Sequence, residues 1–289
     1  MPEIIPTCIW PVQAMLGEGP AWFADEQALR FVDIKGGKIH RYTPATSAQD
    51  STTFAGQPSF VLPRMDGGLL IGSNCELIAL GADGTDRTAL ATLPMPAHNR
   101  TNDATVDSQG RLWFGTMDDA ETRPTGALYC YDRGALTCHG GESVVTNGPA
   151  ISADCQTLYF VHSDARTIWR FTLDDDAQIT RREIFLQLPA ADGHPDGIVL
   201  DSEDCLWVAL WDGWGLRRYA PDGTLLLHIH FPCARVTKLA FGGPNLTDAY
   251  VTTARIGLSA DDLSNQPLAG GLFHFIAPAP GRRLPAVQC

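Results

Sequence analysis

The sequence predicts an all-β fold, a single six-bladed β-propeller of residues 1–289 that closes by pairing its N- and C-terminal segments. Short apolar runs recur at separations of 40, 43, 46, 48 and 43 residues, the length of a four-stranded propeller blade. Strand residues are β-branched or aromatic, and no stretch longer than ten residues keeps a helical period. The runs begin at Leu29, Leu69, Leu112, Leu158, Leu206 and Ala249.

Each run follows a turn rich in polar residues and glycine, such as MDGG before Leu69 and DSQG before Leu112. Because such turns join the strands of hairpins, each run is predicted to be the second strand of its blade. The apolar segment from Ile4 to Val12 precedes the first innermost strand and is free to pair with the last blade. That pairing closes the ring and removes exposed sheet edges. A β-sandwich with accidental regularity is the alternative, but six units leave almost no sequence for a second domain.

The composition excludes several classes of partner. A net charge of −12 and a pI of about 5.0 argue against binding to nucleic acid or anionic membranes. The start MPEIIPTCIW lacks the basic and apolar regions of a signal peptide, and no run of 18 apolar residues is present. Eight scattered cysteines without a CxxC pair fit reduced thiols. We expect a cytoplasmic protein that is a monomer or a weak dimer.

Polar oxygen side chains recur at one place in the repeat, four residues before an apolar strand position. They are Glu18, Asn102, Asn147 and Asp196. Residues at one repeat position are symmetry mates in a ring, so these side chains are expected to converge on the central axis. Oxygen ligands suit a hard divalent cation, and Glu18, Asn147 and Asp196 would bind one with two negative charges and open positions. The alternative is that each belongs to an ordinary turn.

A second set of positions lies at the ends of the second strands. Five of its six residues are polar, and they are expected to ring the same mouth, as a polyol substrate requires. Its positions are Asp33, Ser73, Thr116, His162, Leu210 and Thr253. Arg100, two residues before Asn102, could hold hydroxyls or a carbonyl through its fixed donors, and Lys238 could do the same. His194 could form part of the wall. Solvated loop residues and polar strand ends are the alternatives.

Four motifs together resemble the SMP-30/gluconolactonase family, which includes regucalcin. They are GEGP at 17–20, NRTNDATVDSQGRLWFGTM at 99–117, TNGPAIS at 146–152 and PDGIVLDSE at 195–203. The resemblance extends from about Leu16 to Phe275, and the tail TTARIGLSADDLSNQPLAGGLF is similar to the bacterial sugar-acid lactonase branch, xylonolactonase-like enzymes included. It implies a six-bladed propeller with one catalytic divalent metal: calcium, zinc, manganese, magnesium or ferrous iron.

The resemblance also assigns roles to residues. Glu18, Asn147 and Asp196 match the metal ligands, and Asp196 matches the general base. Arg100 and Asn102 match substrate-contacting positions. The sequence departs from the family at Ala120, where animal members carry a substrate-contacting glutamate. Asp119 and Glu121 flank this alanine, and either carboxylate is expected to take the place of that glutamate.

The implied activity is metal-dependent hydrolysis of an aldonolactone, such as xylono-, arabinono- or gluconolactone, to the aldonic acid. Whether Asp196 or the metal activates the attacking water stays open. The alternatives are a calcium-binding regulatory protein of the regucalcin type and a hydrolase of another lactone or ester. A propeller that only binds proteins is a further alternative, in which the mouth residues would be arbitrary.

Overall fold

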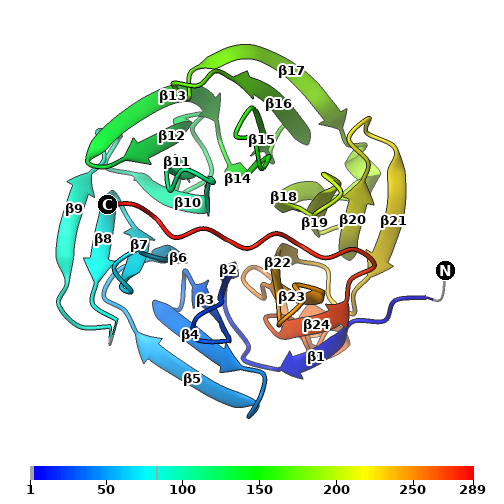
Figure 1. Cartoon of the computed structure of the whole chain (residues 1–289). Coiled ribbons are helices and arrows are strands. Elements are labelled where there is room, and N and C mark those ends of the chain that lie inside the picture. The colour runs from blue at the N-terminus through cyan, green and yellow to red at the C-terminus, as the bar shows by residue number, and fades with distance from the viewer. Residues whose placement is uncertain (1–2, 83) are drawn as a thin grey trace.

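The computed structural model describes residues 3–82 and 84–289, so residues 1, 2 and 83 of the predicted domain lie outside the described part. Six four-stranded sheets surround a central axis, which confirms the predicted six-bladed propeller (Figure 1). Within each sheet the neighbouring strands are antiparallel. The predicted second strands are confirmed, since each observed one begins within one residue of its expected start.

The first three blades follow the chain from the hub outward. Blade 1 consists of β2 (Gly17–Phe23), β3 (Ala28–Asp33), β4 (Lys38–Thr43) and β5 (Ala48–Thr53). Blade 2 consists of β6 (Pro58–Pro63), β7 (Leu69–Ser73), β8 (Glu76–Leu80) and β9 (Thr88–Thr92). Blade 3 consists of β10 (Asn99–Val106), β11 (Leu112–Asp118), β12 (Gly126–Asp132) and β13 (Ala135–Ser143).

The last three blades complete the ring. Blade 4 consists of β14 (Thr146–Ile151), β15 (Thr157–His162), β16 (Thr167–Leu173) and β17 (Ile179–Gln187). Blade 5 consists of β18 (His194–Leu200), β19 (Leu206–Trp211), β20 (Gly215–Tyr219) and β21 (Leu225–His230). Blade 6 consists of β22 (Val236–Gly242), β23 (Asp248–Thr253), β24 (Leu272–Ile276) and β1 (Thr7–Trp10). The described helical elements are η1 (Ala190–Asp192) and α1 (Ala260–Asn265).

The N-terminal strand closes the ring as predicted. β1 pairs antiparallel with β24, with Thr7 opposite His274 and Cys8 opposite Phe273. This strand is the outermost of blade 6, so both ends of the chain contribute to one sheet (Figure 1). The closure matters for the site because it fixes blade 6 against blade 1 and holds the hub at a constant width.

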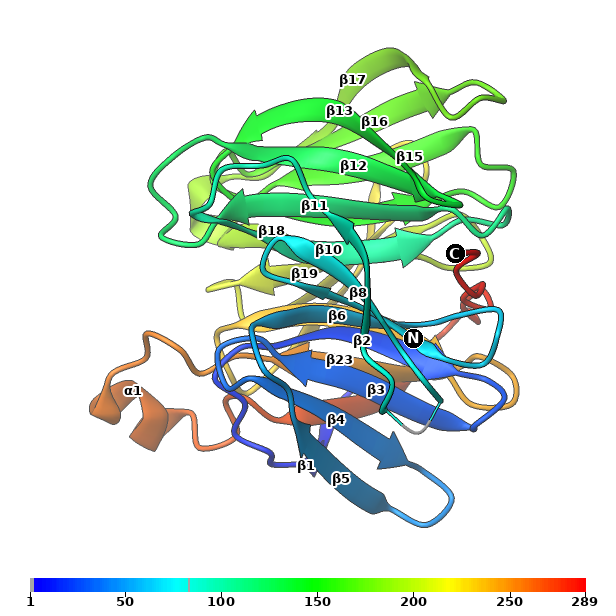
Figure 2. The same ribbon diagram turned by 90° about the vertical axis from the view of Figure 1, so that its left-hand side faces the viewer.

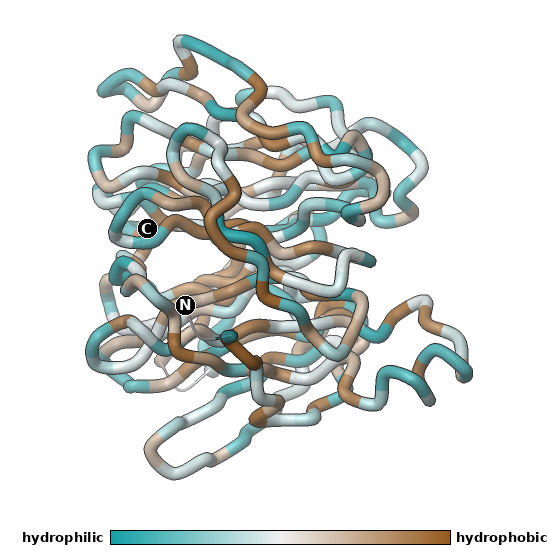
Figure 3. The backbone as a smooth tube through the Cα atoms, turned by 90° about the vertical axis from the view of Figure 1, so that its right-hand side faces the viewer, coloured by the Kyte–Doolittle hydropathy of each residue, from teal (hydrophilic) through white to brown (hydrophobic). Residues whose placement is uncertain are grey.

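Aromatic side chains fill the spaces between adjacent blades. Phe60 of blade 2 lies 6.2 Å from Phe114 of blade 3, measured between ring centroids. Trp207 of blade 5 lies 6.0 Å from Phe241 of blade 6. These rings are buried, and such pairs stabilise a fold by about 0.5–1.5 kcal/mol beyond the burial of their area. Figure 3 shows the hydrophobic stretches along the strands and the hydrophilic ones mainly in the turns and outer loops.

The two faces of the ring differ. Residues 277–289, which we call the strap, cross the axis over one face, as Figure 1 shows for the red segment. The strap is held by backbone hydrogen bonds to several blades, among them one from Met65 N to Val287 O at 3.0 Å and one from Ser202 N to Pro280 O at 2.9 Å. Helix α1 projects on the opposite face (Figure 2). Only the face that carries α1 is left without a strap.

The helices among the described residues are too short to cross a lipid bilayer.

The burial of His40 beside the closing strand β1 predicts how the stability of the fold depends on pH. His40 is buried beside Trp10 of β1 and Phe31, with ring centroids 5.3 and 4.7 Å away. Its Nε2 atom is buried and has no hydrogen-bond partner in the described part of the chain. Burial lowers the pKa of His40 to about 4. Because the unfolded histidine binds a proton more readily, stability is fully present above about pH 6.5 and is lost as pH falls through about 4.

Wild type should therefore lose stability between pH 6.5 and 4 faster than His40→Gln, by up to about 1.4 kcal/mol per pH unit. Urea unfolding curves at several pH values measure this difference. Parallel curves for the two proteins would contradict the assignment of His40 as a buried neutral histidine.

Candidate metal and substrate site

The predicted column of oxygen side chains lies on the innermost strands of four blades. Glu18 is on β2, Asn102 on β10, Asn147 on β14 and Asp196 on β18, and all four are buried. In each of these strands the pairing register shifts at the column residue or beside it. A bulge of this kind bends a strand and re-aims a side chain. The irregularity thus lets the column residue of each inner strand turn toward the hub.

The structure brings the predicted residues together around one cavity of about 500 Å³. Five of its lining residues are Glu18, Arg100, Asn102, Asn147 and Asp196. A separate cavity of about 240 Å³ lies beneath the strap and is lined by Lys238, but by none of the candidate metal ligands and by neither Arg100 nor Asn102. The hub cavity is therefore the candidate site, at the mouth that the strap leaves open.

Three carboxyl groups, those of Glu18, Asp103 and Asp196, are buried at the hub. Burial raises the pKa of Glu18 to about 8, and repulsion from Asp103 adds to this effect. Burial also raises the pKa of Asp196 well above its usual range, together with the charges of Glu18 and Asp103. Lys238 forms a buried ion pair with one oxygen of Asp103, while the other oxygen has no partner among the described residues. One ammonium cannot neutralise three carboxylates, so protons or a further cation must neutralise the rest.

The amide of Asn147 is held in one orientation. Its Nδ2 donates to Ser163 Oγ at 3.0 Å, and its Oδ1 accepts from Asn102 Nδ2 at 2.9 Å. Asn102 Oδ1 accepts in turn from Arg100 Nη1 at 2.6 Å. Since a guanidinium can only donate, this contact fixes the direction of both amides. Asn147 consequently keeps an oxygen lone pair available on the side of the cavity.

These residues fit a hard divalent cation. Glu18 and Asp196 provide carboxylate oxygens, Asn147 an amide oxygen, and all three line the same cavity. Within residues 3–82 and 84–289, no group of three His, Cys, Asp or Glu side chains could hold a metal without other ligands. An amide oxygen such as that of Asn147 would complete a set with two carboxylates. Cysteine and histidine are absent from it, which favours calcium, magnesium or manganese over thiolate-bound zinc.

The loop after β11 separates the two acidic residues that were expected to contact substrate. Glu121 lines the cavity, with its backbone at φ 55°, in the left-handed region. Asp119 is not among the described lining residues, and its Oδ1 accepts from Lys35 Nζ at 2.6 Å and from Arg100 Nε at 2.8 Å. Ala120 is exposed. The structure thus places one carboxylate in the cavity and the other behind Arg100.

The second predicted set of polar residues does not line the cavity as expected. Asp33 accepts two backbone N–H groups from the segment before β2, and Thr116 Oγ1 accepts from Ala127 N at 3.0 Å. In three blades the wall is formed by the next residue, which is Met117, Ser163 or Trp211. Successive residues of an extended chain point to opposite sides, so a shift of one position separates structural from lining residues.

His194 lines the cavity as a wall residue. Arg166 Nη2 lies 3.0 Å from its Nε2, and its Nδ1 lies 2.9 Å from Ser163 O. Because Arg166 can only donate, Nε2 accepts and Nδ1 carries the proton, so both nitrogens are occupied.

Lys238 does not reach the mouth as expected, since it pairs with Asp103.

Sequence reasoning missed several residues of the cavity wall, among them Lys35, Trp211 and Arg235. The Arg235 guanidinium lies 4.8 Å from the centre of the Trp211 ring, so these two form one cationic and aromatic surface. Trp211 directly follows Leu210 of the second column, which is the only signal that could have identified it.

The chain is similar to known proteins in both sequence and fold. Residues 16–255 match the SMP-30/gluconolactonase/LRE-like region. The chain belongs to the SMP-30/gluconolactonase family. Among its relatives is the pentonolactonase XacC of Haloferax volcanii, 35% identical over 275 residues and 92% of each chain. Another is the 6-deoxy-6-sulfogluconolactonase of Pseudomonas putida, 32% identical over 277 residues and 95% of each chain.

A solved member of the family has nearly the same fold. The calcium-binding protein regucalcin from Agrobacterium tumefaciens superposes with a TM-score of 0.95, at 26% sequence identity, over 99% of this chain and 98% of that one. This agreement extends over all six blades, and confirms the resemblance that the four sequence motifs indicate.

The crowded carboxylates of this family member predict an unusual effect of mutation. At pH 9 in EDTA, Asp196→Asn should raise the melting temperature, because it removes one of three mutually repelling buried charges. The same substitution should reduce or abolish the stabilisation that added calcium or manganese gives wild type. Differential scanning calorimetry with and without cation measures both effects. A lower melting temperature in EDTA together with undiminished cation stabilisation would contradict the charge arrangement.

Proposed function

We propose that this protein hydrolyses a sugar-acid lactone to its aldonic acid, with one divalent cation held by Glu18, Asn147 and Asp196. The observation that best supports this function is the convergence of these oxygen ligands with Arg100 and Asn102 on a single cavity. Two relatives named as lactonases support the class of reaction. Opening a lactone breaks an intramolecular ester, so the activity is that of a carboxylic ester hydrolase.

Each side chain has a distinct task in this proposal. A bound divalent cation supplies a Lewis acid for the lactone carbonyl and for the charge that develops on its oxygen. Asp196 accepts a proton from the attacking water, since its carboxylate lines the cavity beside the other candidate ligands. Arg100 and Asn102 provide donors and acceptors that orient the ring hydroxyls.

The remaining wall is suited to a sugar. Glu121 lines the cavity from the loop after β11 and can accept a hydrogen bond from a hydroxyl group. Trp211 offers an aromatic face on another side. A volume of about 500 Å³ accommodates a single sugar ring with several waters.

A calcium-binding regulatory role is the second candidate, favoured by the calcium-binding regucalcin of nearly identical fold. It requires the cation but not the wall of donors around it. The presence of Arg100 and Glu121 in the lining favours an organic ligand beside the metal.

The eight cysteines are unpaired in the structure. This supports the proposal that the protein works in a reducing compartment such as the cytoplasm.

A panel of pentono- and hexonolactones tests the proposed function. Protein stripped of metal should be inactive and should recover on reloading with calcium, magnesium, manganese, zinc or ferrous iron, one at a time. Asp196→Asn should lower kcat by about 10²–10⁴-fold, the range for loss of a general base. A pH-stat that records acid release, corrected for spontaneous hydrolysis, measures the rates.

Glu183→Gln on the outer strand β17 is a matched control, because its ion pairs with Arg170 and Arg181 lie far from the hub. This variant should retain wild-type rates. Tight cation binding without turnover of any lactone would contradict the enzyme and leave the calcium-binding role.

A further inference from the structure

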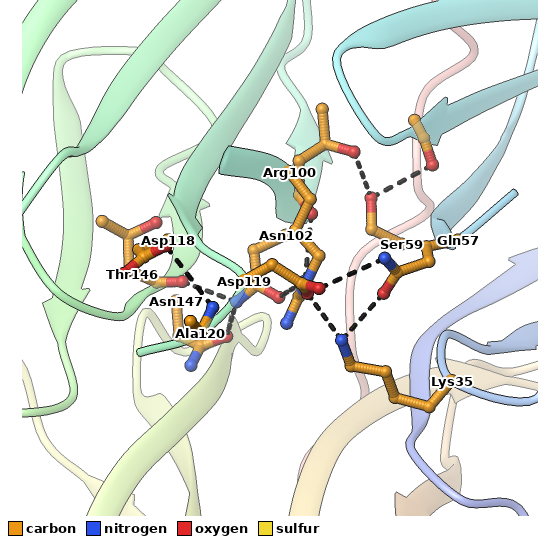
Figure 4. Close-up of polar contacts among 12 residues, drawn as sticks. Lys35, Gln57, Ser59, Arg100, Asn102, Asp118, Asp119, Ala120, Thr146 and Asn147 are labelled. Carbon is orange, nitrogen blue, oxygen red and sulfur yellow. Dashed lines mark hydrogen bonds and ion pairs between the residues drawn. The ribbon is translucent and has the colours of Figure 1, made fainter. Parts of the chain in front are cut away.

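A continuous chain of polar contacts joins the rim of the cavity to the candidate ligand Asn147. At the rim, Asp119 Oδ1 accepts from Lys35 Nζ at 2.6 Å and from Arg100 Nε at 2.8 Å. Asp119 Oδ2 accepts from Gln57 Nε2 at 3.3 Å. Figure 4 shows Asp119 between Lys35, Gln57 and Arg100. Both oxygens of this carboxylate are therefore engaged by protein donors.

Three blades meet at this carboxylate. Lys35 follows β3 of blade 1, Gln57 precedes β6 of blade 2, and Asp119 follows β11 of blade 3. The Lys35 and Asp119 side chains are about a quarter and a third exposed, with relative accessibilities of 26% and 34%. Asp119 is thus placed at a junction of blades, close to the surface yet directed at a buried guanidinium.

From Arg100 the chain continues inward. Arg100 is only 3% exposed, and its Nη1 donates to Asn102 Oδ1 at 2.6 Å. Asn102 Nδ2 then donates to Thr146 O at 2.7 Å and to Asn147 Oδ1 at 2.9 Å. Each amide has only one orientation that satisfies its neighbours, because the Arg100 guanidinium can only donate and the Thr146 carbonyl can only accept. Arg100 and Thr146 together orient Asn102, and Asn102 in turn orients Asn147.

Asp119 is the group that fixes this position. A buried guanidinium needs a negative partner, and burial lowers the pKa of Arg100 while Asp119 opposes that shift. Of the acidic residues that act on Arg100, Asp119 is the one that forms an ion pair with it. Burial raises the pKa of Asp119, but hydrogen bonding from Lys35 and the charge of Arg100 outweigh this and lower it. The carboxylate stays ionised at neutral pH.

We infer that Asp119 is a positioning residue that, with Lys35, holds Arg100 for substrate and orients Asn102 and Asn147 for the metal. The part of this inference that concerns substrate rests on the proposed function. The part that concerns the orientation of Asn147 rests on the hydrogen bonds alone. It replaces the expectation that Asp119 contacts substrate directly, and it leaves Glu121 as the acidic residue in the cavity.

Asp119→Asn provides the test, because it preserves shape but removes the charge and offers an NH₂ group to Lys35 and Arg100. Removing the partner of a metal ligand or substrate residue typically costs 10–100-fold in affinity or activity. We expect kcat/KM for the best lactone to fall by roughly 10–100-fold and the manganese Kd to rise several-fold. Asp119→Glu should restore part of both, and Lys35→Met should show a smaller loss because Arg100 keeps its partner.

Isothermal titration with manganese measures the Kd independently of catalysis, so the part that concerns Asn147 and the metal is tested even if wild type hydrolyses no lactone. Glu183→Gln serves again as the control with wild-type values. Unchanged Kd and kcat/KM in Asp119→Asn would overturn the inference. Losses that follow a lower melting temperature and are not restored by Asp119→Glu would also overturn it, because they indicate a purely structural role.

Discussion

The hub of this propeller depends on the burial of like charges. Glu18, Asp103 and Asp196 lie in one desolvated region with Lys238, and burial raises the pKa of all three carboxyl groups. The charge of Asp103 adds to the shift of Glu18, and the charges of Glu18 and Asp103 add to that of Asp196. Such a cluster is unfavourable unless protons or a cation neutralise it. The surrounding ring makes the arrangement possible, since closure by β1 and the aromatic contacts between blades hold the inner strands together. Stability elsewhere in the ring offsets the local cost of the site.

The site also depends on the orientation of its polar side chains. A metal ligand of fixed orientation requires a fixed partner, and the series from Asp119 through Arg100 and Asn102 to Asn147 provides it. Arg100 lines the cavity and also belongs to this series, so in the proposed function one guanidinium links the binding of lactone with the binding of cation. The strap on the opposite face leaves a single mouth for both ligands.

The fold and the ligand column could be predicted from sequence because a propeller converts a sequence period into rotational symmetry. Glu18 and Asn147 are 129 positions apart in the chain, yet share one place in the repeat. Residues that interact without sharing a repeat position gave no such periodic signal in the sequence. Lys238 and Asp103 meet across the hub, and Asp119 accepts hydrogen bonds from residues of two other blades. The second polar column was displaced by one residue, because periodicity locates a strand end but not the side to which its last residue points.

The central claim is that Glu18, Asn147 and Asp196 bind one cation in the hub. Anomalous X-ray diffraction from crystals grown with manganese tests this claim most directly. The account predicts a single strong anomalous peak in the hub cavity within about 2.0–2.6 Å of oxygens from these three residues, the range for hard cations. A peak bound by other residues, or a hub without a peak in protein that binds manganese in solution, would contradict it.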